Sequence, residues 1–253
     1  MYKKIFFYLI VLFFIASCSN KKDLLYYQDI QTNSQSSINY VANEIQVNDI
    51  LYIKVDALIQ DSAKPFNLEI NNTAAASLQN YRVQGYLVAL DGTIVFPILG
   101  TIKVVGKTTN QLQIILKDLL KEKGYIKDAN VNVRVINGKV TILGEVKNPG
   151  TYSFDEQNIS LNQAIGYAGD LTIFGKRNDI LLIRENNGTR NYIKIDLTKS
   201  DWFNSPYYYV KQNDIIVVNP NGAKVMSSGY LSNVGSIIGI LSLITTILIL
   251  TRT

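Results

Sequence analysis

The sequence predicts an α+β fold in which two small domains are followed by a C-terminal membrane-spanning helix. Three observations predict it. Strand-like alternation and helix-like spacing of apolar residues succeed one another twice along the 253-residue chain. A segment without charged side chains covers residues 230–251. The length suits one or two small domains plus tails.

The N-terminus has the pattern of a bacterial secretory signal that ends at a lipid attachment site. Lys3 and Lys4 precede an apolar run at 5–14, which is too short to span a bilayer, and Ala16-Ser17 leads into Cys18. We expect residues 1–17 to be a lipoprotein signal peptide, Cys18 to be lipidated, and residues 18–39 to form a lipid-anchored linker. The alternative is a chance cysteine in an ordinary signal peptide or an uncleaved anchor.

The first predicted domain covers residues 40–136. A strand is expected at 50–55, where apolar and polar residues alternate. Residues 86–96 read as two strands of a hairpin, joined by the turn Asp91-Gly92 and stopped by Pro97.

A helix and a final strand complete this domain. Thr108 or Thr109 can cap the helix, its leucines and isoleucine repeat at helical spacing, and Gly124 ends it. Alternating valines predict a strand at 131–135. Residues 60–80 receive no assignment.

The second predicted domain covers residues 137–220. It begins with a strand at 139–146 and a turn at Asn148-Pro149-Gly150. Ser160 caps a short helix that Gly169 ends. Further strands are expected at 152–154, 179–184, 191–196 and 215–218. One short helix against a mixed, curved sheet suggests a β-grasp arrangement.

Two local patterns invite more specific readings. An Asn-Asp pair stands just before an apolar strand at both Asn48-Asp49 and Asn213-Asp214, which is weak evidence for a repeat and is also common turn chemistry. The stretch 100–108 resembles a phosphate-binding loop. Its glycines are one residue too far apart, and its β-branched interior favours extended backbone, so a junction from strand through turn to helix is expected.

The amino-acid composition limits the kinds of catalysis and ligand binding to expect. The chain has no histidine and one cysteine, so the usual zinc ligands and histidine-dependent dyads are missing. Without Lys3 and Lys4 it has 23 basic and 20 acidic side chains, and this net charge of +3 is too small to argue for nucleic acid. We expect no catalytic residues, no metal and no cofactor.

The C-terminal segment at 228–252 is expected to cross a membrane, because residues 230–251 would form a helix of about 33 Å. Small and polar residues share one face of this helix: Ser232, Gly235, Ser236, Gly239, Ser242 and Thr246. Three interpretations remain open: a plain anchor, a face for helix packing, or a stave that lines a pore.

The quoted motifs resemble a known family. Residues 86–100, with the following Gly106-Lys-Thr, helix and valine strand, resemble the signature domain of outer-membrane polysaccharide export proteins. Residues 144–152, the helix ending at Gly169 and the strand after Asp214 resemble the SLBB (soluble-ligand-binding β-grasp) domain of that family. Turn formers in these motifs are Asp91, Gly92, Pro97, Gly100, Gly144, Pro149 and Gly150.

The resemblance implies an outer-membrane lipoprotein whose folded domains lie in the periplasm. Identical subunits would form a ring whose C-terminal helices make a channel for capsular polysaccharide or exopolysaccharide. The ring would dock on an inner-membrane polysaccharide co-polymerase that often carries a tyrosine kinase. A single SLBB domain, where relatives can carry more, leaves the subunit number open.

Two other functions compete with export. One is a lipid-anchored periplasmic β-grasp protein that binds a ligand, with the last helix as a membrane tether. The other is an envelope enzyme that uses carboxylates such as Asp91, Glu145 and Asp214, although turns and strand ends explain their positions. The run Tyr207-Tyr208-Tyr209 suits either sugar stacking or an interface.

Overall fold

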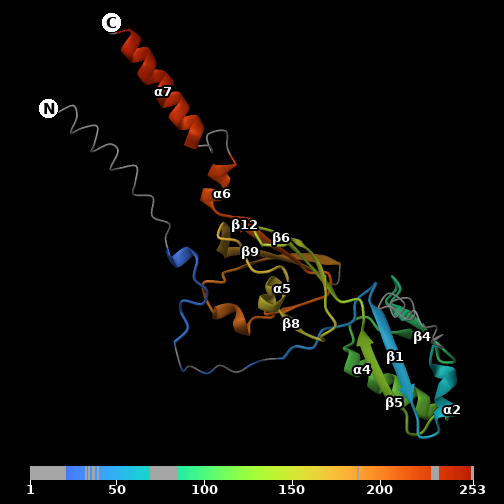
Figure 1. Cartoon of the computed structure of the whole chain (residues 1–253). Helices are drawn as coiled ribbons and strands as arrows, with labels where there is room; N and C mark the ends of the chain where they lie inside the picture. Colours follow the sequence, from blue (N-terminus) through green and yellow to red (C-terminus); the bar gives the residue numbers. More distant parts are fainter. Residues whose placement is uncertain are drawn as a thin grey trace.

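The structure is a computed structural model that describes residues 21–31, 33, 35, 38, 40–68, 85–186, 188–228 and 234–251. Figure 1 shows two sheet-containing domains with helix α7 (Val234–Leu250) beyond the second. Each domain has its own hydrophobic core, one drawn from residues between Ile45 and Val133 and the other from residues between Val140 and Val218. Both domains mix helices and strands, as the α+β prediction requires.

The first domain is organised around β1 (Ile50–Asp56). This strand pairs antiparallel with β2 (Tyr86–Leu87) on one side and β5 (Asn130–Val135) on the other. Its buried face carries Leu51, Ile53 and Val55, which are the residues that the alternation selected. The strand predicted at 50–55 is therefore confirmed.

The hairpin in this domain does not have the predicted partners. Strand β3 (Thr93–Phe96) pairs with β4 (Gly100–Lys103), and β2 pairs with β1 instead. The hairpin turns after Pro97, where Ile98 and Gly100 have φ of 63° and 80°. Pro97 does end β3, and the left-handed residues after it reverse the chain into β4. The tight turn at Asp91-Gly92 instead leads from β2, the partner of β1, into β3.

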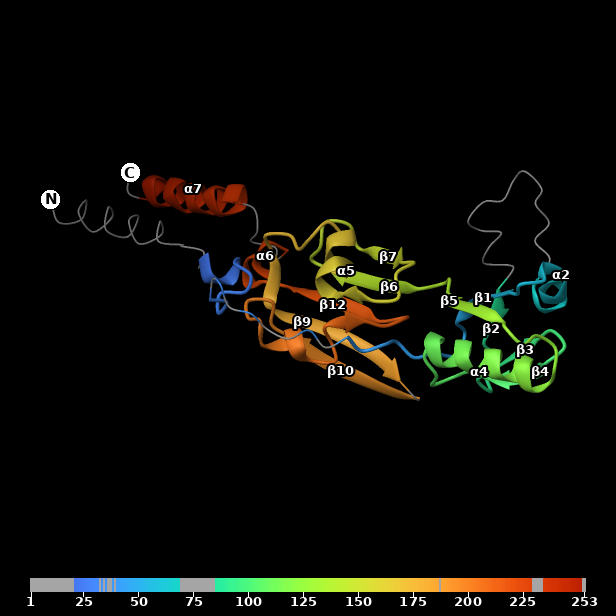
Figure 2. The same ribbon diagram turned by 90° about the horizontal axis from the view of Figure 1, so that it is seen from below.

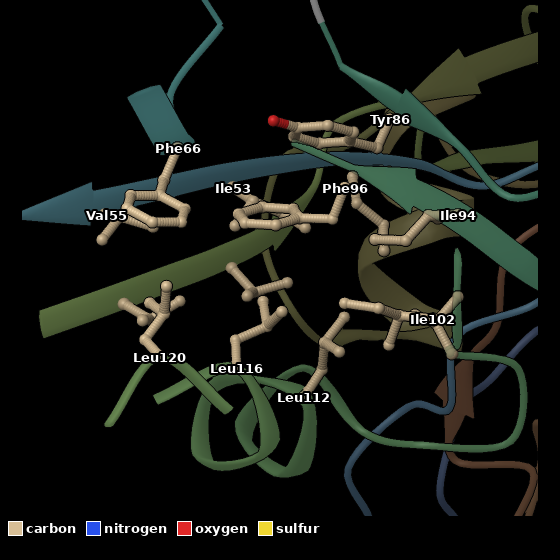
Figure 3. Close-up of a cluster of buried hydrophobic side chains, with 14 of the residues drawn as sticks. Ile53, Val55, Phe66, Tyr86, Ile94, Phe96, Ile102, Leu112, Leu116 and Leu120 are labelled. Atoms are coloured by element: carbon tan, nitrogen blue, oxygen red, sulfur yellow. The ribbon is translucent and has the colours of Figure 1, made fainter. Parts of the chain in front are cut away.

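Helix α4 (Thr109–Glu122) closes the first core. Thr108 caps it, and the Thr108 and Gln111 side chains exchange hydrogen bonds with each other's backbone N–H groups. Figure 3 shows Leu112, Leu116 and Leu120 pointing from α4 toward the strands and toward Phe66. Phe66 comes from η2 (Lys64–Phe66), which follows the short helix α2 (Gln60–Ala63).

The second domain contains a five-stranded sheet in the order β10-β9-β12-β6-β7. Its strands are β6 (Lys139–Gly144), β7 (Gly150–Ser153), β9 (Gly175–Asn186), β10 (Thr189–Ile195) and β12 (Ile215–Pro220). β12 runs parallel to β6, and the other neighbours are antiparallel. Gly144 has a φ of 87°, and a Cβ there would collide with the backbone of Val218 on β12, so the close approach of these two strands requires glycine.

Helix α5 (Leu161–Tyr167) packs on the second core. Ser160 caps it through a capping box with Gln163, and Gly169 follows in a left-handed conformation with φ of 77°. Strands β8 (Ile159–Ser160) and β11 (Tyr209–Val210) pair beside it, with η3 (Asp201–Asn204) preceding β11. One short helix against a mixed sheet is the arrangement expected of a β-grasp domain.

Part of the predicted linker is packed against the second domain. After η1 (Lys21–Asp23), the Tyr27 and Gln28 N–H groups donate to the carbonyls of Leu197 and Thr198, at 3.1 and 2.7 Å. Tyr26 and Tyr27 pack against the second core. Figure 2 shows this segment lying beside the second domain before the chain runs on to the first.

The predicted membrane-spanning helix at 228–252 is wrong. The chain forms α6 (Gly222–Ser227) and then α7, which at 17 residues is about 26 Å long, short of a hydrocarbon core of about 30 Å. Within the described residues, no helix combines the length and the apolar character needed to cross a membrane. The sequence estimate counted residues from 230, whereas the described helix begins at Val234.

Candidate functional site at the domain junction

The two Asn-Asp pairs form the same turn, one at the start of β1 and one at the start of β12. Asn48 and Asn213 have φ of 68° and 63°, a left-handed conformation that asparagine tolerates. In each turn the aspartate Oδ2 accepts a hydrogen bond of 2.8 Å from the N–H three residues earlier. Asp49 and Asp214 are each only 1% exposed. The sequence echo is therefore a shared local structure.

Asp214 has an arginine partner. The Arg184 guanidinium donates from Nε to Oδ1 at 3.0 Å and from one terminal nitrogen to Oδ2 at 2.7 Å. Its remaining donors reach the carbonyls of Pro206 and Tyr209. Burial raises the pKa of Asp214, and Arg184 opposes that effect. This pair ties β9 to the turn before β12.

Asp49 has no such partner. Its Oδ1 is buried without a hydrogen bond to any described residue, and burial raises the pKa of its carboxyl to about 6. The Gln46 N–H favours the ionised form but does not offset the burial. The same turn is thus electrostatically satisfied in the second domain and unsatisfied in the first.

Asn137, between β5 and β6, connects the two turns. Its Oδ1 accepts from the Ile50 N–H at 2.8 Å, and its Nδ2 donates to the Asn48 carbonyl at 2.9 Å. The Gln212 side chain donates to the Asn137 carbonyl at 2.9 Å and accepts from the Lys139 N–H at 2.7 Å. The two hydrogen bonds of the Asn137 side chain reach the first domain, and the two of the Gln212 side chain hold Asn137 and Lys139 within the second.

A cavity of about 310 Å³ lies at this junction. The first domain contributes Asp49 and Arg134 to its wall, and the second contributes Phe154, Asn158 and Gln212. Asn158 Oδ1 is a second buried oxygen without a hydrogen-bond partner among the described residues. Sequence reasoning missed Asn137, Asn158 and Gln212, because only their neighbours in space make them distinctive.

The tyrosine run at 207–209 is divided between packing and surface. Tyr208 packs on Trp202 and Phe203, with ring centroids 5.7 and 5.6 Å away. The Tyr209 ring stacks on Tyr40, which is 75% exposed, at a centroid distance of 6.0 Å. Tyr208 therefore packs within the second domain, and the exposed ring beside this run is that of Tyr40.

The three carboxylates considered for catalysis are not brought together. Asp91 accepts hydrogen bonds from the Thr93 N–H and hydroxyl groups within its turn. Glu145 accepts from the Thr172 hydroxyl at 2.8 Å. Asp214 is held by Arg184, so each carboxylate has separate local partners.

The other predicted residues are distributed over the fold. Gly92 lies in a turn of the first domain and Gly100 begins β4, both with positive φ, and Pro149 precedes β7, which Gly150 begins. The stretch resembling a phosphate loop forms β4, a turn at Gly106 and the cap of α4, as expected. Cys18 and Ser232 lie outside the described residues.

The residues of the helix stripe that are described lie on α7. Gly235, Gly239, Ser242 and Thr246 are exposed there. The Ser242 and Thr246 hydroxyls donate to the carbonyls of Gly239 and Ser242 on their own helix, at 2.9 and 2.8 Å. These hydroxyls are therefore satisfied without a partner helix. Ser236 lies in α7, and its side chain is not among those described.

The structure therefore has two small α+β domains that meet at a polar junction beside a shared cavity. The model for "Polysaccharide biosynthesis/export protein" matches residues 39–136, and the model for the SLBB domain matches residues 139–194. Their order and bounds follow the two cores. The chain belongs to the polysaccharide biosynthesis/export protein family.

Curated relatives agree with this assignment. The chain is 38% identical over 106 residues to the EPS I polysaccharide export outer membrane protein EpsA of Ralstonia nicotianae, which is 40% of this chain and 27% of that protein. It is 35% identical over 94 residues to the protein of the same name from Ralstonia solanacearum, which is 36% of this chain and 24% of that protein. The chain thus spans about a quarter of the length of these relatives.

Proposed function

We propose that this chain exports polysaccharide across the outer membrane and performs no covalent chemistry. The observation that carries the proposal is the succession of an export domain and an SLBB domain, which share one hydrogen-bonded junction at Asn137. The relatives' names, export proteins of the outer membrane, support it. Asp91, Glu145 and Asp214 have separate local partners, so these three carboxylates do not form a catalytic pair.

The proposal includes a lipid anchor at Cys18 and periplasmic domains. The pattern of charged, apolar and small residues before Cys18 supports the anchor. The hydrogen bonds of Tyr27 and Gln28 hold the segment that follows Cys18 against the second domain. This domain would accordingly lie nearer the lipid than the first one.

The proposal also includes a ring of identical subunits that works with an inner-membrane polysaccharide co-polymerase, with or without a tyrosine kinase. Exposed apolar side chains on the first domain support self-association, among them Leu90 and Val95, which are 85% and 74% exposed. The exposed small residues of α7 offer a face where copies of this helix can pack.

Deleting the coding sequence tests the export role. The expected result is loss of surface polysaccharide that the full chain restores.

The Cys18→Ser variant should accumulate without acyl label and restore little export, and unchanged labelling would contradict the lipid anchor. Electron microscopy of the full chain in detergent should show closed rings, whereas a stable monomer would contradict the assembly.

A lipid-anchored ligand-binding protein is the second candidate function. The junction cavity favours it, because it is lined by side chains from both domains and has unpaired acceptor oxygens. A monomer that binds a small ligand, together with normal export in the deleted cells, would select this alternative.

A further inference from the structure

We propose that the junction cavity binds a neutral saccharide unit through its hydroxyl groups, which donate to Asp49 Oδ1 and Asn158 Oδ1. The proposal rests on the polysaccharide export function and adds a place of contact on the chain. The first observation is that four buried side-chain atoms lack hydrogen-bond partners in the described part of the chain. Two of these atoms belong to residues that line this one cavity.

The unpaired atoms determine which ligand chemistry fits. Both are oxygens that accept hydrogen bonds, so a complementary ligand must donate. Asp49 is 1% exposed, and a buried acceptor without a donor is costly. A sugar hydroxyl donates one hydrogen bond and also accepts, so neighbouring hydroxyls of one ring can satisfy two separate oxygens.

The twin turn at Asp214 supports this reading. In the second domain the same carboxylate position receives two donors from Arg184. In the first domain the corresponding carboxylate lines a cavity instead. The turn therefore has the geometry to hold a donor group, and among the described residues the Gln46 N–H alone donates to Asp49.

The charge of the wall favours a neutral ligand over an acidic one. The cavity is lined by four carboxylates, those of Glu44, Asp49, Asp155 and Glu156, and by two cations, Arg134 and Lys211. A uronic acid or phosphate would face this excess of negative charge. Phe154 adds an apolar wall, and binding sites commonly combine such a wall with a few polar groups.

The size is consistent with a short saccharide. The volume of about 310 Å³ is at the lower end of the range for small-molecule sites, about 300–1,000 Å³. Because the wall comes from both domains, an occupied cavity would also bridge the junction that Asn137 and Gln212 hold.

The test uses the purified full-length chain in detergent and three probes: cellobiose, digalacturonate and calcium ion. Saturation-transfer NMR and titration should show binding of cellobiose, with digalacturonate weaker by about tenfold or more. The Asp49→Ala and Asn158→Ala variants should each weaken cellobiose binding by about tenfold. Asp118→Ala, on the exposed face of α4, is the matched control and should bind normally.

Asn158→Ala leaves the turn at Asp49 intact, so it tests the site even if Asp49→Ala disturbs the fold. Unchanged cellobiose affinity in both variants would overturn the proposal, as would tighter binding of digalacturonate or binding of calcium alone. Export assays separate a failure of the proposed saccharide site from a failure of the proposed export function. If cellobiose does not bind but the chain still restores surface polysaccharide, the site is wrong and the export function stands; if the deletion leaves export normal, the export function itself is wrong.

Discussion

The turns at Asp49 and Asp214 have the same backbone and different surroundings. Both buried carboxylates accept from the N–H three residues earlier, but only Asp214 also receives the Arg184 guanidinium. A buried charge that is paired and hydrogen-bonded is tolerated, whereas an unpaired one lowers stability. The comparison indicates that the second turn is built for stability and that the first keeps an acceptor available.

The largest expected effect comes from removing the partner of Asp214. Arg184→Met should lower the free energy of unfolding of the second domain by about 3–5 kcal/mol, because it leaves a buried carboxylate without compensation. Thermal and denaturant unfolding of the full chain would measure it. Arg190→Met is the control, since its exposed pair with Glu185 is worth about 1 kcal/mol or less. Equal losses of unfolding free energy in the two variants would contradict the expected difference between the buried pair and the exposed pair.

The next effect depends on pH and concerns Asp49. Its folded pKa of about 6 lies above the unfolded value of 3.8, so folding favours the protonated form and stability falls as pH rises through that interval. Asp49→Asn should therefore stabilise the chain by about 2–3 kcal/mol at about pH 8 and change it little below about pH 4.

Thermal melting of the Asp49→Asn variant at both pH values measures this effect. Asp214→Asn is the matched comparison and should destabilise the chain at the higher pH, because the Arg184 guanidinium then loses its charged partner. A destabilised Asp49→Asn variant at high pH would show that the carboxylate charge stabilises the first turn as well.

Asn137→Ala should have a smaller effect at the junction between the turns. The variant removes two side-chain hydrogen bonds to the first domain and should cost about 1–3 kcal/mol. Faster amide exchange at Ile50, which donates to Asn137, would report the change directly. Asn191→Ala, at an exposed position on β10, should leave this amide unaffected. Unaltered exchange at Ile50 in both variants would mean that Asn137 does not join the domains.

The smallest effect concerns the segment that follows the proposed lipid site. The Tyr26 hydroxyl donates to Asp170 at 2.5 Å, and the Arg177 guanidinium lies 5.1 Å from the centre of its ring. Tyr26→Phe keeps the ring and loses about 0.5–1.5 kcal/mol from one hydrogen bond. Amide exchange at Tyr27 and Gln28 should increase, whereas Tyr125→Phe in the first domain should not change it. Identical exchange would contradict a docking role for Tyr26.

Local chemistry made much of the fold predictable. The caps at Thr108 and Ser160, the turn glycines and the alternation at 50–55 act over a few residues, and the structure contains these elements. The hairpin partner was not predictable in this way, because β3 could pair on either side and the residues after Pro97 decided it. The helix at the C-terminus was overestimated, since hydropathy gives the extent of an apolar run and not where a helix starts.

The candidate site was less accessible from the sequence. The Asn-Asp echo was visible, but its meaning depends on Arg184, which is 30 positions from Asp214 along the chain. Asn137 and Gln212 also read as ordinary loop residues, and only the meeting of the domains gives them a role. Side chains that act through distant partners carry no local pattern.

The most direct measurement of the central claim is the location of the polysaccharide in cells that lack this chain. Pulse-labelled sugar followed through cytoplasmic, periplasmic and surface fractions would separate synthesis from export. Export by this chain predicts that labelled polymer is made and then held inside the outer membrane, and that the full chain restores it to the surface. Labelled polymer that reaches the surface at the normal rate without the chain would contradict the account.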